Sequence, residues 1–154
     1  MTTRTMTIFD YSNVYELWNC VPGIGLNRSD DSFDGFKRYI ERNLNTSFVA
    51  EYEKKIIGAV LAGHDGRRGY LYHAAVLPQY RNRGIGRKLI NQSLDALAKE
   101  GISKVGLLAF RENDAGNAFW EVMGFGARDD CTYRDKMIRE MIYQSNPYLR
   151  DKNN

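Results

Sequence analysis

A short basic segment, residues 79–88, carries residue types that bind anions. It follows an apolar run that ends at Pro78, and it leads into a segment whose apolar residues have helical spacing. Amide groups at a helix N-terminus point outward and favour an anion there, and glycines let a ligand approach the backbone. We therefore predict a pyrophosphate-binding turn between a strand and a helix. It combines two glycines with four cationic side chains: Gly84, Gly86, Arg81, Arg83, Arg87 and Lys88.

The spacing in this turn excludes two common nucleotide motifs. No Gly-Lys-Ser/Thr closes it, as the phosphate loop of nucleotide hydrolases requires, and Leu89 stands where the dinucleotide fingerprint needs a third glycine. The pattern Arg-x-x-Gly-x-Gly after Val-x-Pro instead resembles the acetyl-coenzyme A motif of the GNAT superfamily of N-acetyltransferases.

A second segment strengthens this resemblance. From Asn113 to Phe125 the chain contains Asn-Ala-Phe-Trp-Glu-Val-Met-Gly-Phe at its end, which is similar to the Asn…Leu-Tyr-x-x-x-Gly-Phe segment of that family. The two motifs and the element order cover about residues 4–142. The resemblance implies an enzyme that transfers the acetyl group of acetyl-CoA to a primary amine of a small molecule, peptide or protein. The amine attacks directly, without a covalent enzyme intermediate.

The family also implies which residues hold acetyl-CoA. Backbone groups at the end of a strand would bind pantetheine like an added strand, and an asparagine would contact it from the next helix. Amides of the turn would bind the pyrophosphate, and Arg81 with its basic neighbours would suit the remaining phosphate. In chain order, these cofactor residues are Ala74, Ala75, Val76, Arg81, Arg83, Gly84, Ile85, Gly86, Arg87, Lys88 and Asn113.

The catalytic residues depart from the family pattern. The amide of Val76 would stabilise the tetrahedral oxyanion. Trp120 stands where the family often has a tyrosine acid, and an indole donates hydrogen bonds but is no acid at neutral pH. Leu108 stands where some members have a carboxylate. Trp120 either shapes the thioester pocket or packs in the core, and the alternative function is a non-catalytic acyl-CoA-binding or sensing module.

A base must remove a proton from an amine whose reference pKa is about 10.4. His73 is the candidate, because it precedes the pantetheine-contacting run; the alternative is a half-buried strand histidine with a hydrogen-bond partner. Acids in the loops could attract a cationic amine or simply be solvated. The remaining candidates for the base, for substrate positioning or for attraction of the amine are His64, Tyr70, Tyr72, Tyr133, Glu51, Asp30, Asp31, Asp129 and Asp130.

Hydrophobic periodicity predicts an α/β fold of one domain spanning residues 1–154, with a loose tail from about residue 143. The expected order is β-α-α-β-β-β-α-β-α-β-β. This order predicts a mixed, mostly antiparallel sheet, and the resemblance to the GNAT superfamily implies a splay between two central parallel strands. The expected strands are 5–9, 47–52, 55–62, 70–76, 104–110, 125–129 and 133–142; the helices run to residue 20, from 33 to 44, 83 to 100 and 113 to 123.

Composition limits the partners. Two cysteines, Cys20 and Cys131, and two histidines cannot build a Cys/His metal cluster, so no metal is expected. No apolar run reaches the ~20 residues of a membrane span, and the first residues lack the apolar region of a secretory signal, so we expect a cytoplasmic protein without a membrane partner. The net charge of +3 does not call for nucleic acid. The architecture allows a homodimer that pairs the late strands.

Overall fold

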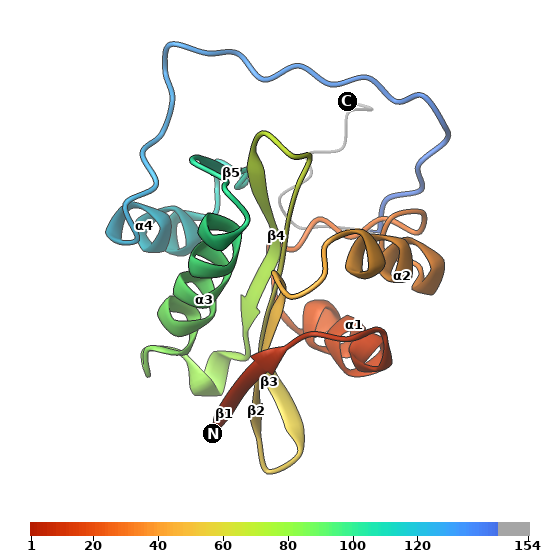
Figure 1. Cartoon of the computed structure of the whole chain (residues 1–154), viewed down its shortest axis with the longest axis vertical. Helices are drawn as coiled ribbons and strands as arrows, with labels where there is room; N and C mark the ends of the chain where they lie inside the picture. The colour runs from red at the N-terminus through yellow and green to blue at the C-terminus, as the bar shows by residue number, and fades with distance from the viewer. Residues whose placement is uncertain (145–154) are drawn as a thin grey trace.

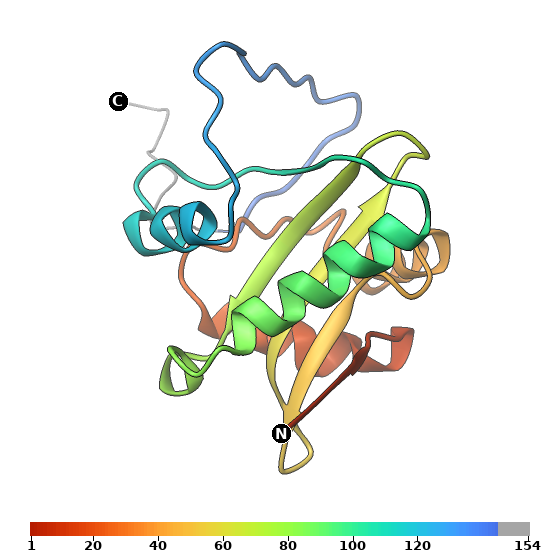
Figure 2. The same cartoon turned by 60° about the vertical axis from the view of Figure 1, so that its left-hand side comes forward.

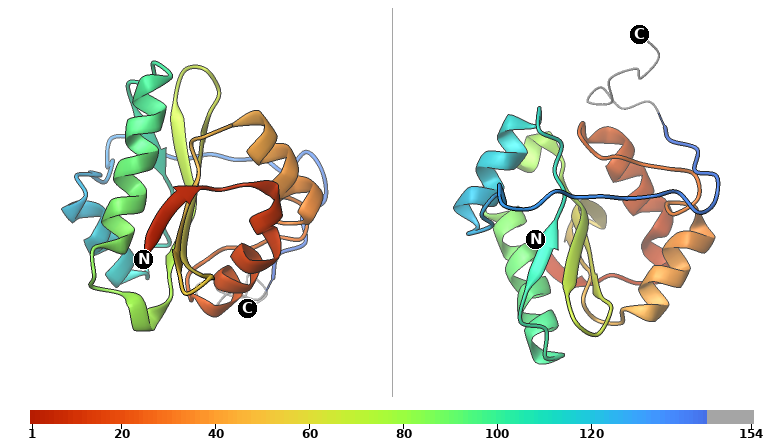
Figure 3. Two further views of the ribbon diagram at one scale, coloured as in Figure 1. Left: turned by 60° about the horizontal axis from the view of Figure 1, so that its bottom comes forward. Right: turned by 90° about the horizontal axis from the view of Figure 1, so that it is seen from above.

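A five-stranded sheet lies between two layers of helices in the computed structural model, which describes residues 1–144 (Figure 1). Helices α3 and α4 cover one face, and α1 and α2 cover the other (Figures 1 and 3). The elements are β1 (Thr2–Thr5), the 3-10 helix η1 (Ile8–Asp10), α1 (Tyr11–Cys20), α2 (Phe33–Arg42), β2 (Phe48–Tyr52), β3 (Lys55–His64), β4 (Gly69–Val76), the 3-10 helix η2 (Pro78–Tyr80), α3 (Ile85–Lys99), β5 (Val105–Leu107) and α4 (Asp114–Val122).

The strand order is β1-β2-β3-β4-β5. The first four strands pair antiparallel, and β4 and β5 pair parallel. A parallel pair needs a crossover connection, and α3 supplies it. The predicted fold class, a mixed and mostly antiparallel sheet with one parallel pair, is confirmed.

A β-bulge interrupts β4 in its middle. Tyr72 pairs with Leu61 and Ala75 pairs with Ala59, so two residues of β4 stand opposite one residue of β3. The first of them, His73, has φ +50°, which is uncommon for a residue other than glycine. A bulge bends the strand that carries it. The pairing of β4 with β5 ends at Leu71, just before the bulge, so the two parallel strands part there as predicted.

Helix α3 packs closely on the sheet, along which it lies in Figure 2. Its buried side chains Ile85, Leu89, Ile90 and Leu97 recur at helical spacing, as expected from the sequence. Gly58 of β3 permits this approach, because a Cβ there would lie 3.1 Å from Leu89 Cδ1. This packing fixes where α3 begins, and therefore where the basic turn lies.

Two of the observed strands differ from their predicted bounds by three or more residues at one end or both. The first lies at Thr2–Thr5 instead of 5–9, because the buried Asp10 accepts a hydrogen bond from the Thr7 amide (2.8 Å) and closes a 3-10 turn. The Asp10 carboxylate also binds the Arg4 guanidinium through two hydrogen bonds (2.7 and 2.8 Å). The fifth strand is shorter than expected, Val105–Leu107 instead of 104–110, because its pairing ends where β4 bends away.

The two strands predicted at 125–129 and 133–142 are not formed. We call residues 125–144 the C-terminal segment; it runs from α4 past the β3–β4 hairpin to the side of α1 and α2 (Figures 1 and 3). Residues 126–140 are all exposed, so no face of this stretch is buried, and a strand needs a partner edge and a buried face for stability. The segment ends in a single bridge between Tyr143 and Asn27. The part of the predicted tail that follows residue 144 lies outside the described residues.

Within residues 1–144, every helix is too short or too polar to cross a membrane.

The packing of α3 predicts a difference between two identical substitutions. Leu89→Ala should lower the free energy of unfolding by about 2–5 kcal/mol, because it leaves a cavity between α3 and the sheet. Leu44→Ala removes the same atoms from a side chain that is 61% exposed, and should change stability by about 0.5 kcal/mol or less. Urea unfolding of both variants measures this, and equal losses would contradict the packing described.

Candidate functional site

The basic turn presents unpaired amides at the start of α3. Gly84 is the residue before the helix, with φ +76°, and the first helical hydrogen bond runs from the Lys88 amide to the Gly84 carbonyl (3.0 Å). The amides of Ile85, Gly86 and Arg87 therefore precede the helical ladder and have no partner within it. Together with the helix dipole, these amides are the groups that the sequence predicts would bind an anion.

The cationic side chains of the turn do not all behave alike. Arg83, Arg87 and Lys88 are exposed, and the Arg83 guanidinium lies 5.5 Å from the centre of the Tyr80 ring. Arg81 instead folds back, and its Nε donates to the Val76 carbonyl (3.2 Å). Arg81 thus joins the turn to the end of β4, which the sequence did not indicate.

The outer edge of β4 faces the gap in front of β5. The Leu77 amide donates to the Ile57 carbonyl (2.9 Å), and amide direction alternates along a strand. The Val76 amide is therefore directed to the opposite edge, away from β3. Ala75 pairs with Ala59 and is buried, so Val76 is better placed than Ala75 to bind a ligand in the gap.

Helix α4 forms the other wall of this gap. Asn113 is its N-cap and accepts from the Gly116 amide (3.0 Å). Asn117, which the sequence analysis did not single out, donates from Nδ2 to the Phe110 carbonyl (2.9 Å) and holds the loop between β5 and α4. A Cβ on Gly86 would lie 3.4 Å from the Phe119 ring, so α4 contacts the start of α3.

Trp120 stands where the family often has a tyrosine, and Leu108 stands where some members have a carboxylate. In the structure, Trp120 packs against aromatic rings and Leu108 is exposed. Trp120 is half-buried, with its ring centre 5.1 Å from that of Phe119 and 5.3 Å from that of Phe125. Leu108 is 58% exposed. A role of Trp120 toward the thioester stays a prediction.

On the opposite face of the sheet, two predicted candidates form a pair. His73 Nε2 lies 2.7 Å from Asp31 Oδ1, and the two side chains are 15% and 5% exposed. The Trp18 indole donates to the His73 carbonyl (3.0 Å), and its ring packs edge-on against the imidazole at 4.8 Å. Trp18 was not among the predicted site residues, and its contact with His73 becomes visible only in the folded structure.

An Asx turn holds Asp31 in place. Asn27 Oδ1 accepts from the amides of Ser29 (3.1 Å) and Asp30 (2.7 Å), and the Asn27 amide donates to Asp31 Oδ2 (2.8 Å). The sequence Asn-x-Ser-Asp is a usable signal for such a turn. The C-terminal segment binds the same loop, because the Arg28 amide donates to the Ile142 carbonyl (2.8 Å).

A cluster of tyrosines adjoins this pair through Tyr72, whose ring centre lies 6.5 Å from that of His73. The Tyr72 ring centre lies 5.0 Å from that of Tyr70 and 5.9 Å from that of the mostly buried Tyr39. Burial raises the pKa of Tyr72, and the nearby Tyr133 and Asp30 raise it further. Burial also raises the pKa of Tyr70. These phenols are therefore neutral near pH 7 and suit substrate contact better than base catalysis.

The other candidate bases are engaged elsewhere. His64 Nε2 lies 2.5 Å from Glu100 Oε2 and ties the β3–β4 hairpin to the end of α3. Glu51 pairs with Arg4 across β1 and β2 (3.2 Å). In the exposed C-terminal segment, Asp129 is exposed and Asp130 pairs with Arg128 (2.6 Å).

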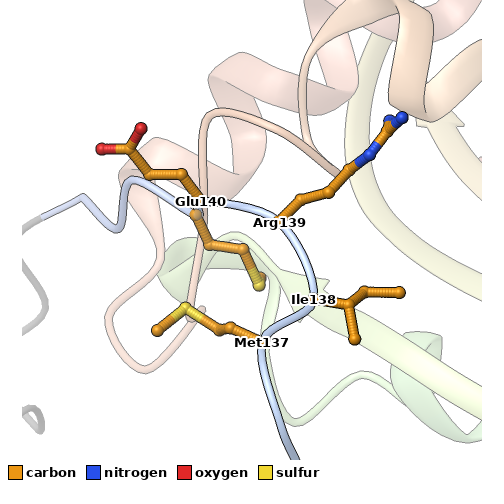
Figure 4. A pocket seen from close by; sticks show the side chains of 5 residues that line it. Met137, Ile138, Arg139 and Glu140 are labelled. Carbon is orange, nitrogen blue, oxygen red and sulfur yellow. The ribbon is translucent and has the colours of Figure 1, made fainter.

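A surface hollow of about 370 Å³ lies in the C-terminal segment (Figure 4). The side chains of Arg139 and Glu140 point in different directions from the backbone of the C-terminal segment, as Figure 4 shows. The lining of the hollow, residues 137–141, contains no residue predicted for the site.

Comparison with known proteins agrees with this geometry. The model of the acetyltransferase (GNAT) family matches residues 11–125. An acetyltransferase of Pectobacterium atrosepticum is 34% identical over 108 residues, which cover 68% of this chain and 77% of that protein.

Solved structures share the fold. PaiA N-acetyltransferase from Thermoplasma acidophilum, in complex with coenzyme A, has a TM-score of 0.69 at 18% identity, covering 93% of this chain and 98% of that one. Aminoglycoside N-acetyltransferase AAC(6')-Iy, in complex with CoA, has a TM-score of 0.68 at 19% identity, covering 88% and 99%. At these identities, the likeness shows the fold alone.

The geometry of the turn predicts a contrast between two glycine substitutions at opposite ends of α3. Gly84 and Gly101 both have positive φ and open space around a Cβ, so aspartate strains both equally. Gly84→Asp should abolish coenzyme A binding in calorimetry, because it adds negative charge beside the free amides. Gly101→Asp should leave the affinity within about twofold, although an acid at a helix C-terminus destabilises the helix more.

Unchanged affinity of the Gly84→Asp protein would refute the pyrophosphate site. Gly86→Asp should also abolish binding, but it is a less clean probe because Phe119 lies against that position.

Proposed function

The chain belongs to the acetyltransferase (GNAT) family, and we propose on that premise that it transfers the acetyl group of acetyl-CoA to a primary amine. One observation carries the proposal: the parallel strands β4 and β5 part directly beside the anion-binding start of α3. A cosubstrate that joins an extended amide chain to a pyrophosphate needs both features side by side. Its amides can pair with a strand edge while its phosphates meet a helix N-terminus.

The residues present fit acetyl-CoA. The outer edge of β4 from Ala74 to Val76 would hold pantetheine, and the amides from Ile85 to Arg87 would hold the pyrophosphate. Exposed Arg83, Arg87 and Lys88 add positive charge for the remaining phosphate. Asn113 and the neighbouring Asn117 fix the α4 side of the gap through backbone hydrogen bonds. When bound, acetyl-CoA supplies an activated acetyl thioester.

The protein groups that stabilise the reaction follow from this placement. The Val76 amide, directed away from β3, would donate to the oxygen that gains negative charge as the amine attacks. A thiol has a reference pKa of about 8.5, so the thiolate leaves without a strong acid. The replacement of the family tyrosine by Trp120 is therefore compatible with turnover.

The acceptor enters from the face covered by α1 and α2 in this proposal. Exposed Asp30 and the exposed ring of Tyr72 lie on that face and would attract a cationic amine. The solved relatives include enzymes described as acting on aminoglycosides and on the alanine of a ribosomal protein, so the acceptor class is broad. The proposed acceptor is an amine of a small molecule, a peptide or a protein. We also propose a cytoplasmic location and allow for a homodimer.

A non-catalytic acyl-CoA-binding or sensing module is the second candidate. The observation that favours it is the absence of an acid or carboxylate at Trp120 and Leu108, the positions where the family often has one. Such a module would bind acetyl-CoA through the same turn but release no thiol.

The two candidates predict different results in one assay. The protein should bind acetyl-CoA in calorimetry and release free thiol in the presence of at least one member of a panel of polyamines, aminoglycosides and peptides with free N-termini. Thiol release should depend on both substrates, and mass spectrometry should find the acetylated amine. Binding without turnover on every amine would favour the sensing module and contradict the enzyme.

A further inference from the structure

We propose that His73 accepts the proton that the substrate ammonium group must lose, and that Asp31 positions His73 for this step. The inference rests on the proposed acetyl transfer and adds the base and its positioning residue. Its basis is the 2.7 Å contact of a bulge histidine with a buried carboxylate, on the sheet face opposite α3.

The bulge places His73 at the meeting point of the two substrates. His73 is followed directly by Ala74, where the cofactor edge of β4 begins, and its ring lies toward α1, against Trp18. The imidazole therefore stands on the acceptor face, next to the strand residues that would hold the thioester. An attacking amine has to reach this same place.

The backbone around His73 is held in an uncommon conformation. A non-glycine residue at φ +50° costs roughly 1–2 kcal/mol, which the Trp18 hydrogen bond to the His73 carbonyl helps to offset. The Asp31 carboxylate fixes the ring from the other side. A histidine held at such a position by two contacts is preorganised, as a base requires.

Among the charged and titratable groups near the bulge, His73 is the one best suited to act as the base. Asp31 approaches from the α1–α2 loop, and Tyr72 lies on β4 with its ring centre 6.5 Å away. Trp18, from α1, does not titrate. The raised pKa of Tyr72 keeps its phenol protonated. The negative charge of Asp30, on the loop, contributes to this rise. Imidazole has a reference pKa near 6.5, so it can accept protons at neutral pH.

The contact with the Asp31 carboxylate determines which ring nitrogen of His73 carries the hydrogen in the neutral ring. Nε2 donates its hydrogen to Asp31 Oδ1, so the acceptor lone pair of the neutral ring is on Nδ1. In the step proposed, an N–H bond of the substrate ammonium breaks, directly or through one water. The proton moves to Nδ1, and the electron pair stays on nitrogen.

The freed pair then forms the C–N bond to the acetyl carbon as the C–S bond breaks and the thiolate leaves. The thiolate takes up the second proton of the amine, and the imidazolium returns its own proton to solvent. The Asp31 carboxylate, 2.7 Å from Nε2, stabilises the imidazolium.

The chain offers a matched control for the test. Both of its histidines contact a carboxylate through Nε2, His73 with Asp31 and His64 with Glu100. His73→Gln keeps a donor for Asp31 but cannot accept the proton, and His64→Gln makes the same change at the β3–β4 hairpin, beside Glu100. Acetyl-CoA affinity and thermal unfolding of both variants check that the fold persists.

His73→Gln should lower kcat/KM by about 10²-fold or more near neutral pH, the typical contribution of a general base. The deficit should shrink as the pH approaches the pKa of the substrate amine, because the amine then needs no base. Asp31→Asn should show a smaller deficit that narrows in the same way. His64→Gln should match the wild type at every pH.

A His73→Gln deficit that stays constant across pH, or no deficit, would overturn this inference and leave acetyl transfer standing. A wild-type protein that transfers no acetyl group to any amine would overturn both proposals.

Discussion

One extra residue in the middle of β4 is the constraint on which the rest of the site depends. His73 and Ala74 together stand opposite Val60, and the strand must bend to accommodate them. The bend ends the pairing with β5 and leaves the amide of Val76 facing a gap instead of another strand. The same residue turns its imidazole toward the loop between α1 and α2. The strand edge proposed for the cofactor and the face proposed for the acceptor thus meet at the β-bulge.

Elements on both faces hold this defect in place. On one side, α3 packs through Leu89 against Gly58 and fixes the turn with its free amides. On the other, Trp18 binds the His73 carbonyl, and Asn27 orders the loop that carries Asp31. The C-terminal segment adds backbone hydrogen bonds to the same loop. The proposed acceptor side is therefore built from segments far apart in the chain, whereas the proposed anion site comes from a single turn.

This difference explains which features could be predicted from the sequence. The turn from Arg81 to Lys88 and the helix after it were predicted correctly, because glycine spacing and apolar periodicity are local. The contact of His73 with Asp31 joins positions 42 residues apart and depends on the register of β3 with β4, which no local pattern contains. Residues 133–142 were predicted as a strand, but a strand also needs an edge to pair with, and residues 133–140 are all exposed.

The central claim is that acetyl-CoA binds where β4 leaves β5 and α3 begins. The most direct test is a titration of the labelled protein with coenzyme A, followed through its backbone amide resonances. The largest shifts should fall on Val76 and on Gly84 to Lys88, with the His64–Gly69 hairpin unaffected. Shifts concentrated on the C-terminal segment, or on the loop that carries Asp31, with Val76 and the turn unchanged, would contradict the account.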